Sequence, residues 1–359
     1  MGEGDCGRRW RGAANHTQAA RAGPVQKSPR QLRPQYGPVL AILQVTFPFF
    51  ALVFCGYLAA RRRMLPLEAI GGLNAFVLFF ALPCMLYRFG ASTPIAQLLD
   101  PFALLVYLAC ALLMVAGAVG FSLNERIRWN DAGFGALVAA FPNTGFMGVP
   151  LLVALLGPAA AGPAILTILV DLVVTSSLCI ALSRLDGADE HGASIAARKA
   201  LRGVAANPMP WAIVLGGASS ALGLVPLKPI ADTVGMLADA ASPVALFTIG
   251  AVLARSQVVG AAQEHGPLPA RDFVPMAIAK LLVHPLLVLA VGSAARALGW
   301  PLDAFALTVM VLVAALPSAS NVSLLAERFG ADTGRVARII LLTTTAAFLT
   351  FSGAVALLR

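Results

Sequence analysis

Long apolar segments constrain this chain more than any other feature. A helix that crosses the hydrocarbon core of a bilayer needs about 20 consecutive, mostly apolar residues. Ten segments of the sequence meet this requirement: 39–60, 69–88, 102–122, 132–156, 162–183, 208–226, 231–254, 272–295, 303–326 and 336–358. With 58% hydrophobic and 12% charged residues, the chain has too little polar surface for a soluble protein of its length. We therefore predict an all-α integral membrane protein with ten transmembrane helices.

The basic residues between these segments predict how the chain is oriented. Loops after the odd-numbered segments hold fourteen arginines and lysines, whereas the alternate loops hold three. Because basic loops stay on the cytoplasmic side of a membrane, we expect the odd-numbered loops in the cytoplasm and both termini outside. The chain is thus expected to be a multi-pass protein of the cell inner membrane, surrounded by the lipid bilayer.

The chain divides into a basic tail and two halves of similar length. Residues 1–38 carry seven arginines and lysines and little that could form a core, so we expect a disordered tail. A second hypothesis is that translation starts at Val39, because a valine codon can serve as a bacterial start. We expect the first half at 39–184, a cytoplasmic loop at 185–207 and the second half at 208–359.

The two halves share features at matching places. Pro83 in the second segment pairs with Pro243 in the seventh, and AAFPNTGFMGVPLL (139–152) pairs with AALPSASNVSLLAERFG (314–330). Since each half holds an odd number of segments, the halves must cross the membrane in opposite directions. An inverted repeat whose helices are interrupted at corresponding positions is typical of secondary transporters and indicates where they bind substrate.

Pro142 and Pro317 are expected to break the fourth and ninth helices near the bilayer midplane, because proline removes a backbone donor and clashes with the preceding turn. The polar residues that follow are suited to cap the second half-helix of each pair. The half-helix N-termini would then attract an anion. An alternative is that both are ordinary proline kinks. The predicted substrate-binding residues are Asn143, Thr144, Gly145, Ser318, Ser320 and Asn321.

Ionisable side chains within the apolar segments are further candidates. Asp171 could bind a proton or cation, or it could make a structural hydrogen bond as a protonated acid. Lys280 and His284 share a helix face. Lys280 could pair with an acid or with substrate, or its side chain could extend to the cytoplasmic surface. His284 could be a packing residue without a role in transport. Asp171 and Lys280 are our candidates for proton or sodium coupling. Asp239, near the outer boundary, and Asn74, near the cytoplasmic end, are weaker candidates.

These features favour a secondary transporter that moves a small organic anion, a mono- or dicarboxylate, by alternating access. An alternative is a proton- or cation-coupled antiporter of the same architecture with Asp171 as its ion site. A membrane-embedded enzyme is a remote alternative, because the chain shows no motif of a hydrolase, protease or nucleotide-binding site in a suitable context. We expect no cofactor, no metal ion and no nucleic-acid partner, and we leave a homodimer open.

Three stretches resemble the auxin efflux carrier family: FPNTGFMGVPLL (141–152), SPVALFTIGAVLA (242–254) and ALPSASNVSLLAERFG (315–330). The resemblance covers about 39–358. That family includes the plant PIN auxin exporters and bacterial permeases assigned to malate and malonate, so malate or malonate is the substrate that the resemblance implies.

The resemblance also implies a fold and a site. It implies ten helices in two inverted five-helix repeats, with the fourth and ninth helices broken at prolines and crossing in an X at the substrate site. It places the family's substrate-binding asparagine at Asn143. In the ninth helix the plant exporters read Leu-Pro-Gln-Gly, where this chain has Leu316, Pro317, Ser318 and Ala319. This departure argues against auxin as the substrate.

Overall fold

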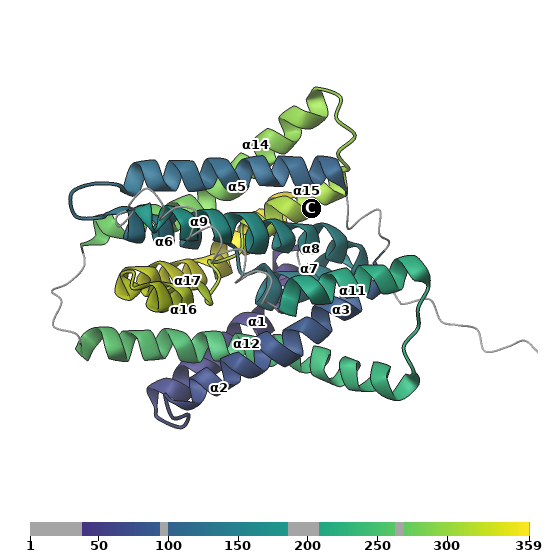
Figure 1. Ribbon diagram of the computed structural model, residues 1–359, viewed down its shortest axis with the longest axis horizontal. Coiled ribbons are helices and arrows are strands. Elements are labelled where there is room, and N and C mark those ends of the chain that lie inside the picture. Colours follow the sequence, from purple (N-terminus) through teal and green to yellow (C-terminus); the bar gives the residue numbers. More distant parts are fainter. Residues whose placement is uncertain (1–37, 94–99, 186–207, 263–268, 359) are drawn as a thin grey trace, which may run out of the picture. The chain divides into compact units, whose positions relative to one another are not determined.

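The computed structural model describes residues 38–93, 100–185, 208–262 and 269–358 (Figure 1). All regular secondary structure in these residues is helical. The predicted tail and the predicted loop at 185–207 lie outside the described residues, apart from residues 38 and 185.

Seven helical segments in the described part of the chain are long and apolar enough to cross a membrane, so the chain is a multi-pass membrane protein. Their bounds are Ile42–Arg61, Ala69–Ser92, Pro101–Ser122, Pro158–Leu182, Lys228–Arg255, Val274–Ala297 and Thr333–Leu358. The other three predicted segments form shorter or interrupted helices. These are α6 (Trp129–Ala140), the π-helical turn η2 (Thr144–Gly148), α7 (Val149–Leu156), α11 (Pro208–Leu222), α15 (Ala304–Ala314) and α16 (Val322–Phe329).

Several of the long segments are themselves built from consecutive elements. In chain order the elements are α1 (Pro38–Arg61), α2 (Ala69–Phe76), η1 (Val77–Ala81), α3 (Leu82–Ser92), α5 (Pro101–Ser122), η3 (Pro158–Ala160), α8 (Ala161–Val170), η4 (Asp171–Thr175), α9 (Ser176–Leu182), α12 (Lys228–Ala262), η6 (Ala270–Asp272), α13 (Val274–Ile278), η7 (Ala279–Val283), α14 (His284–Ala297) and α17 (Thr333–Leu358). The turns η1, η4 and η7 are π-helical, like η2. Such turns are rare and frequently mark functional sites. Asp171 begins η4, and Lys280 lies in η7.

One group of helices contains α1, α2, α3, α11 and α12, and it fills the lower part of the view in Figure 1. Within it α1 packs along α12, and α3 packs along α11. A Cβ atom at Gly56 or Gly250 would overlap a backbone carbonyl oxygen of the facing helix. At Gly216 and Gly90 it would lie 2.5 and 3.2 Å from such an oxygen. Glycine therefore lets both helix pairs approach to backbone contact.

A second group contains α5, α6, α8, α9, α14 and α15, which lie above the first group in Figure 1. Its helices begin at defined caps. Asp100 accepts the N–H groups of Phe102 and Ala103 at the start of α5, and Asp303 accepts the N–H of Ala306 at the start of α15. These caps fix where α5 and α15 begin. The interruptions that follow α6 and α15 are largely buried.

Candidate functional site

The two interrupted helices meet at their breaks. α6 ends at Ala140, just before Pro142, and α15 ends at Ala314, just before Pro317. Pro142 and Ser318 face each other in an isolated antiparallel bridge. The structure therefore brings together the two stretches that the sequence singled out, although they lie far apart in the chain.

Two backbone hydrogen bonds join the breaks. The N–H of Asn143 donates to the carbonyl of Pro317 (2.9 Å), and the N–H of Ala319 donates to the carbonyl of Phe141 (3.0 Å). A backbone group left unpaired at membrane depth costs several kcal/mol, so interrupted helices persist only where protein satisfies them. Here each break satisfies backbone groups of the other.

The side chains after the prolines do not cap the helical turns that follow, and our expectation that they would is wrong. Neither Asn143 nor Asn321 makes a side-chain hydrogen bond to the turn that it precedes. Instead the backbone carbonyl of Asn143 accepts the N–H groups of Met147 and Gly148 (3.1 and 3.0 Å), because the chain resumes as a π-helical turn. The polar side chains at the breaks are therefore not used as caps.

Three of these side chains have a buried oxygen atom without a hydrogen-bond partner: Thr144 Oγ1, Ser318 Oγ and Asn321 Oδ1. Thr144 and Ser318 are 0% and 1% exposed. Buried polar groups are nearly always hydrogen-bonded, and an unpaired one costs about 1–3 kcal/mol. The two hydroxyls, one at each break, can donate to acceptor oxygens of a ligand, whereas Asn321 Oδ1 can only accept.

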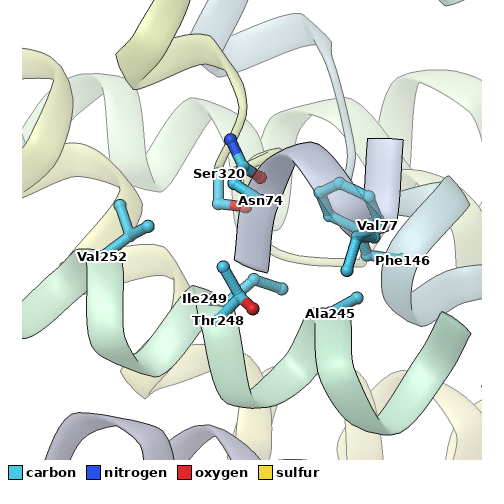
Figure 2. Close-up of a pocket in the computed structure, with 8 residues that line it drawn as sticks. All are labelled: Asn74, Val77, Phe146, Ala245, Thr248, Ile249, Val252 and Ser320. Atoms are coloured by element: carbon cyan, nitrogen blue, oxygen red, sulfur yellow. The ribbon is translucent and has the colours of Figure 1, made fainter. Parts of the chain in front are cut away.

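A small cavity lies between the two breaks and the helices α2 and α12 (Figure 2). Its volume is about 10 Å³, which is about the room that one water needs. Figure 2 shows the polar side chains of Asn74, Thr248 and Ser320 around this space, together with apolar neighbours. The complete lining is Asn74, Val77, Phe146, Ala245, Thr248, Ile249, Val252 and Ser320.

Sequence reasoning gave little or no weight to two residues that line the cavity. Asn74 was a weaker candidate, yet it lines the cavity with Ser320. Thr248 was not considered, although a hydroxyl five residues after Pro243 in an apolar segment was a usable signal. Its side chain also donates to the carbonyl of Val244 in its own helix (2.7 Å).

Other predicted residues pack at the same junction. Asn143 is buried, and its backbone joins the two breaks. Gly145 faces α3, since a Cβ there would lie 3.6 Å from the side chain of Leu82. At Gly148 a Cβ would come within 2.5 Å of the side chain of Leu316, just before the second break. Glycine at 148 therefore permits the close approach of the two interrupted helices.

Asp171 is fully buried in the second helix group. The hydroxyl of Tyr107 donates to its Oδ2 (3.0 Å), and the hydroxyl of Thr175 donates to its Oδ1 (3.1 Å). Both carboxyl oxygens thus have donors, as a buried acid requires. Sequence reasoning missed Tyr107, because nothing local indicates that α5 reaches Asp171.

Lys280 is also fully buried, which excludes the alternative that it extends to the cytoplasmic surface. Its Nζ donates to the carbonyl of Ala314 (2.8 Å) and lies 3.1 Å from Nδ1 of His284. Because Ala314 is the last residue of α15, the ammonium sits at the negative end of that half-helix. The rings of His284 and Tyr107 have centroids 6.2 Å apart, so the Asp171 and Lys280 sites are neighbours.

The remaining ionisable candidate lies at the surface. Asp239 has a side chain that is 72% exposed and pairs with Arg88 at 2.6 Å. Among the residues that the structure describes, no three His, Cys, Asp or Glu side chains gather in a group that could hold a metal ion.

Comparisons with known proteins identify the family of the chain. A family model described as "Membrane transport protein" matches residues 41–355. The chain is 30% identical over 321 residues to a protein named "Putative malonate transporter" from Rhizobium meliloti (strain 1021), covering 89% of this chain and 96% of the relative. It is 29% identical over 297 residues to "Uncharacterized transporter YfdV" from Escherichia coli (strain K12), covering 80% of this chain and 88% of the relative.

A shorter match is to a plant protein. It is 26% identical over 153 residues to "Auxin efflux carrier component 3a" from Oryza sativa subsp. japonica, covering 39% of this chain and 24% of the relative. The resemblance to the auxin efflux carrier family is thereby confirmed. The family and these relatives are transporters, and the chain is not an enzyme. The chain belongs to the membrane transport protein family, which includes auxin efflux carriers.

Proposed function

We propose that this protein is a secondary active transporter that moves a small organic anion, a mono- or dicarboxylate such as malate or malonate, by alternating access. One observation carries the proposal. The breaks of two interrupted helices are joined through their backbones, and the buried hydroxyls of Thr144 and Ser318 have no partner there. A carboxylate accepts hydrogen bonds, so its oxygens would satisfy these donors without a full positive charge at membrane depth.

We propose the ten-helix inverted repeat as the architecture, and the packing of the first helix group supports it. Three residue pairs are each separated by 160 positions: Gly56 and Gly216, Pro83 and Pro243, and Gly90 and Gly250. The four glycines form reciprocal contacts, since Gly56 meets the helix of Gly250 and Gly90 meets the helix of Gly216. A two-fold relation between the halves would produce this exchange.

The small cavity supports alternating access. Its walls come from the two breaks and from the first helix group, with Phe146 and Ser320 on one side and Asn74 and Thr248 on the other. At about 10 Å³ the cavity does not admit a dicarboxylate. Substrate entry therefore requires the first helix group to separate from the breaks at this surface, on one side of the membrane and then on the other.

The choice of substrate rests on chemistry and on relatives. The neutral donors at the breaks suit a carboxylate, and the relative from Rhizobium meliloti carries the name of a malonate transporter. The match to the rice auxin carrier covers less than half of this chain. Ser318 and Ala319 also replace the Gln-Gly of plant exporters at the second break. These points favour an aliphatic carboxylate over auxin.

A second candidate function is proton- or cation-coupled exchange in the same architecture. Asp171 favours it, because this fully buried carboxyl group is held by two hydroxyl donors next to the Lys280 site. An ionisable side chain inside a membrane span is a functional candidate by default. In this mechanism Asp171 would bind the proton or cation, and Lys280 would hold the end of α15 at the second break.

The experiment is the flux of radiolabelled malonate and malate into proteoliposomes that contain the purified protein. Asn143→Ala keeps the backbone bond to Pro317 but removes the amide, and Thr144→Val with Ser318→Ala removes both unpaired hydroxyls. Each is expected to reduce flux at least about tenfold, the effect of losing roughly 1.4 kcal/mol of binding. Thr345→Val is the control, because this threonine is exposed and bonds only within its own helix.

Thermal unfolding of each variant separates loss of binding from loss of fold. Wild-type flux in the Asn143 and Thr144/Ser318 variants would contradict the proposed site. No malonate or malate flux in the wild-type protein would contradict the proposed substrates.

A further inference from the structure

A second, larger cavity lies where α5 ends and where α13 and α17 begin. Its volume is about 340 Å³, within the usual range of small-ligand sites. Residues that line it include Phe121, Arg126, Arg271, Asp272, Met276 and Arg335. Three arginines against one aspartate give this lining a net positive charge. It holds none of the residues at the helix breaks, so it is separate from the proposed substrate site.

Arg335 is the buried arginine in the lining of this cavity. It is 3% exposed, and its Nε and Nη1 donate to the backbone carbonyls of Asp272 and Asp131 (both 2.8 Å), while Nη2 lies 3.3 Å from the hydroxyl of Ser122. These acceptors are neutral, so no carboxylate oxygen contacts the guanidinium directly. Gly135 makes room for it, since a Cβ there would lie 2.7 Å from Nη1. The carboxylates of Asp131, Asp332 and Asp272 act on this guanidinium from farther away, so the charge that can attract an anion comes mainly from Arg126 and Arg271.

Arg126 and Arg271 lie at the mouth, on either side of Asp272. Their contacts with its carboxylate are long, 3.4 Å and 3.9 Å, and their side chains are 54% and 81% exposed. Exposed pairs of this kind contribute little stability. Both guanidinium groups can therefore turn toward a ligand, and their planar array of donors matches the oxygens of a phosphate.

The cavity sits at the boundary between membrane and water. One membrane span ends at Ser122, and two others begin at Val274 and Thr333. The arginines around this end belong to loops that the basic-residue count predicts to be cytoplasmic. Basic pockets between transmembrane helices on that side bind the headgroups of anionic lipids.

An open strip on α5 leads away from the cavity along the outer surface. Leu113, Gly117, Gly120 and Phe121 share one helix face, and all four are exposed. A Cβ atom at Gly117 or Gly120 would have no heavy atom within 4 Å. The two glycines thus leave this face open next to larger apolar side chains, and Phe121 at its end also lines the arginine-lined cavity.

We propose that this cavity binds the phosphate of an anionic phospholipid from the cytoplasmic leaflet, and that the Gly117–Gly120 face of α5 receives one of its acyl chains. The arginines provide the charge, and the apolar strip distinguishes a lipid from a free anion. A lipid bound there would join α5, α13 and α17 at their membrane boundary.

The test is native mass spectrometry of the full-length protein in detergent, titrated with phosphatidylglycerol or with phosphatidylcholine as the neutral lipid. We expect preferential binding of phosphatidylglycerol and a loss of about tenfold or more in Arg126→Gln/Arg271→Gln, because each basic residue near a membrane surface adds attraction to anionic lipid. Arg296→Gln is the control, an exposed arginine at the other end of the helix that continues α13. Arg335 is not substituted in this test, because its side chain bonds to three segments of the chain and its loss could disturb the fold.

A second variant distinguishes a lipid from a soluble anion. Gly117→Leu/Gly120→Leu fills the strip without steric conflict and should weaken phosphatidylglycerol binding, whereas Gly71→Leu, at another glycine without neighbours within 4 Å, should not. Equal retention of both lipids by the wild-type protein would overturn the proposal. So would phosphatidylglycerol binding that is unaffected by the leucines but is displaced by inorganic phosphate, since the cavity would then be a site for free anions.

Discussion

Gly250→Ala should destabilise the protein, whereas Gly235→Ala in the same helix should not. A Cβ atom at Gly250 would overlap the carbonyl oxygen of Val53 and lie 2.6 Å from the backbone nitrogen of Tyr57, both in α1. At Gly235 it would have no heavy atom within 4 Å. The same chemical change therefore meets rigid backbone at one position of α12 and open space at the other.

The expected magnitudes follow from these distances. Alanine is favoured over glycine in a helix by about 1 kcal/mol, so Gly235→Ala should be neutral or stabilising by up to that amount. Ordinary contact begins at 3.4 Å, so a Cβ at Gly250 would be 0.8 Å too close to the nitrogen of Tyr57. Backbone atoms cannot turn aside, so α1 and α12 must move apart. Overpacking costs about 1–3 kcal/mol and occasionally more, and we expect about 3 kcal/mol here.

The assay is thermal unfolding of the purified variants in one detergent at one scan rate, because irreversible unfolding makes the melting temperature depend on scan rate. We expect Gly250→Ala to melt several degrees below the wild-type protein and Gly235→Ala to melt at or above it. Gly56→Ala should behave like Gly250→Ala, since the contact is reciprocal. Equal melting temperatures for all three variants would refute the inference that α1 and α12 are held at backbone contact.

Two further predictions concern the buried ionisable residues. Asp171→Asn should make malonate flux independent of an imposed pH gradient if Asp171 is the coupling site, and flux that a gradient still accelerates would remove it from that role. Lys280→Met should lower the free energy of unfolding by about 1–3 kcal/mol, because the carbonyl of Ala314 at the end of α15 loses its partner. Lys228→Met is the control, since this exposed lysine makes only a surface pair with Asp232. An equal decrease in melting temperature for both variants would show that the bond from Lys280 to Ala314 does not stabilise the fold more than a surface pair does.

Much of the fold was predictable because its causes are local. Apolar length indicates a membrane span, and proline ends a helix by losing a donor, so each predicted segment overlaps a described helix, and seven of these helical segments are long enough to cross a membrane. The observed ends of some helices differ from the predicted ends, because contacts with neighbouring structure determine where a helix ends. α12, for example, extends to Ala262 beyond the predicted end at residue 254.

The bonds around the site could not be predicted, because their partners lie far apart in the chain. Nothing near Asp171 indicates Tyr107, and nothing near Lys280 indicates the carbonyl of Ala314. The expected capping by Asn143 failed for a related reason. The chain resumes after that residue as a π-helical turn, whose N–H groups bond to its backbone carbonyl rather than to its side chain.

The packing also indicates which surfaces are free to move during transport. α1 and α12 are in backbone contact, and so are α3 and α11, so these pairs cannot slide past each other without steric conflict. The interrupted helices are bonded to each other through two backbone pairs, and Lys280 holds the end of one of them. At the cavity, by contrast, the first helix group faces the breaks through side chains, with Thr248 on one side and Phe146 on the other. If substrate enters by the proposed alternating access, we therefore expect the first helix group to move against the breaks along this surface.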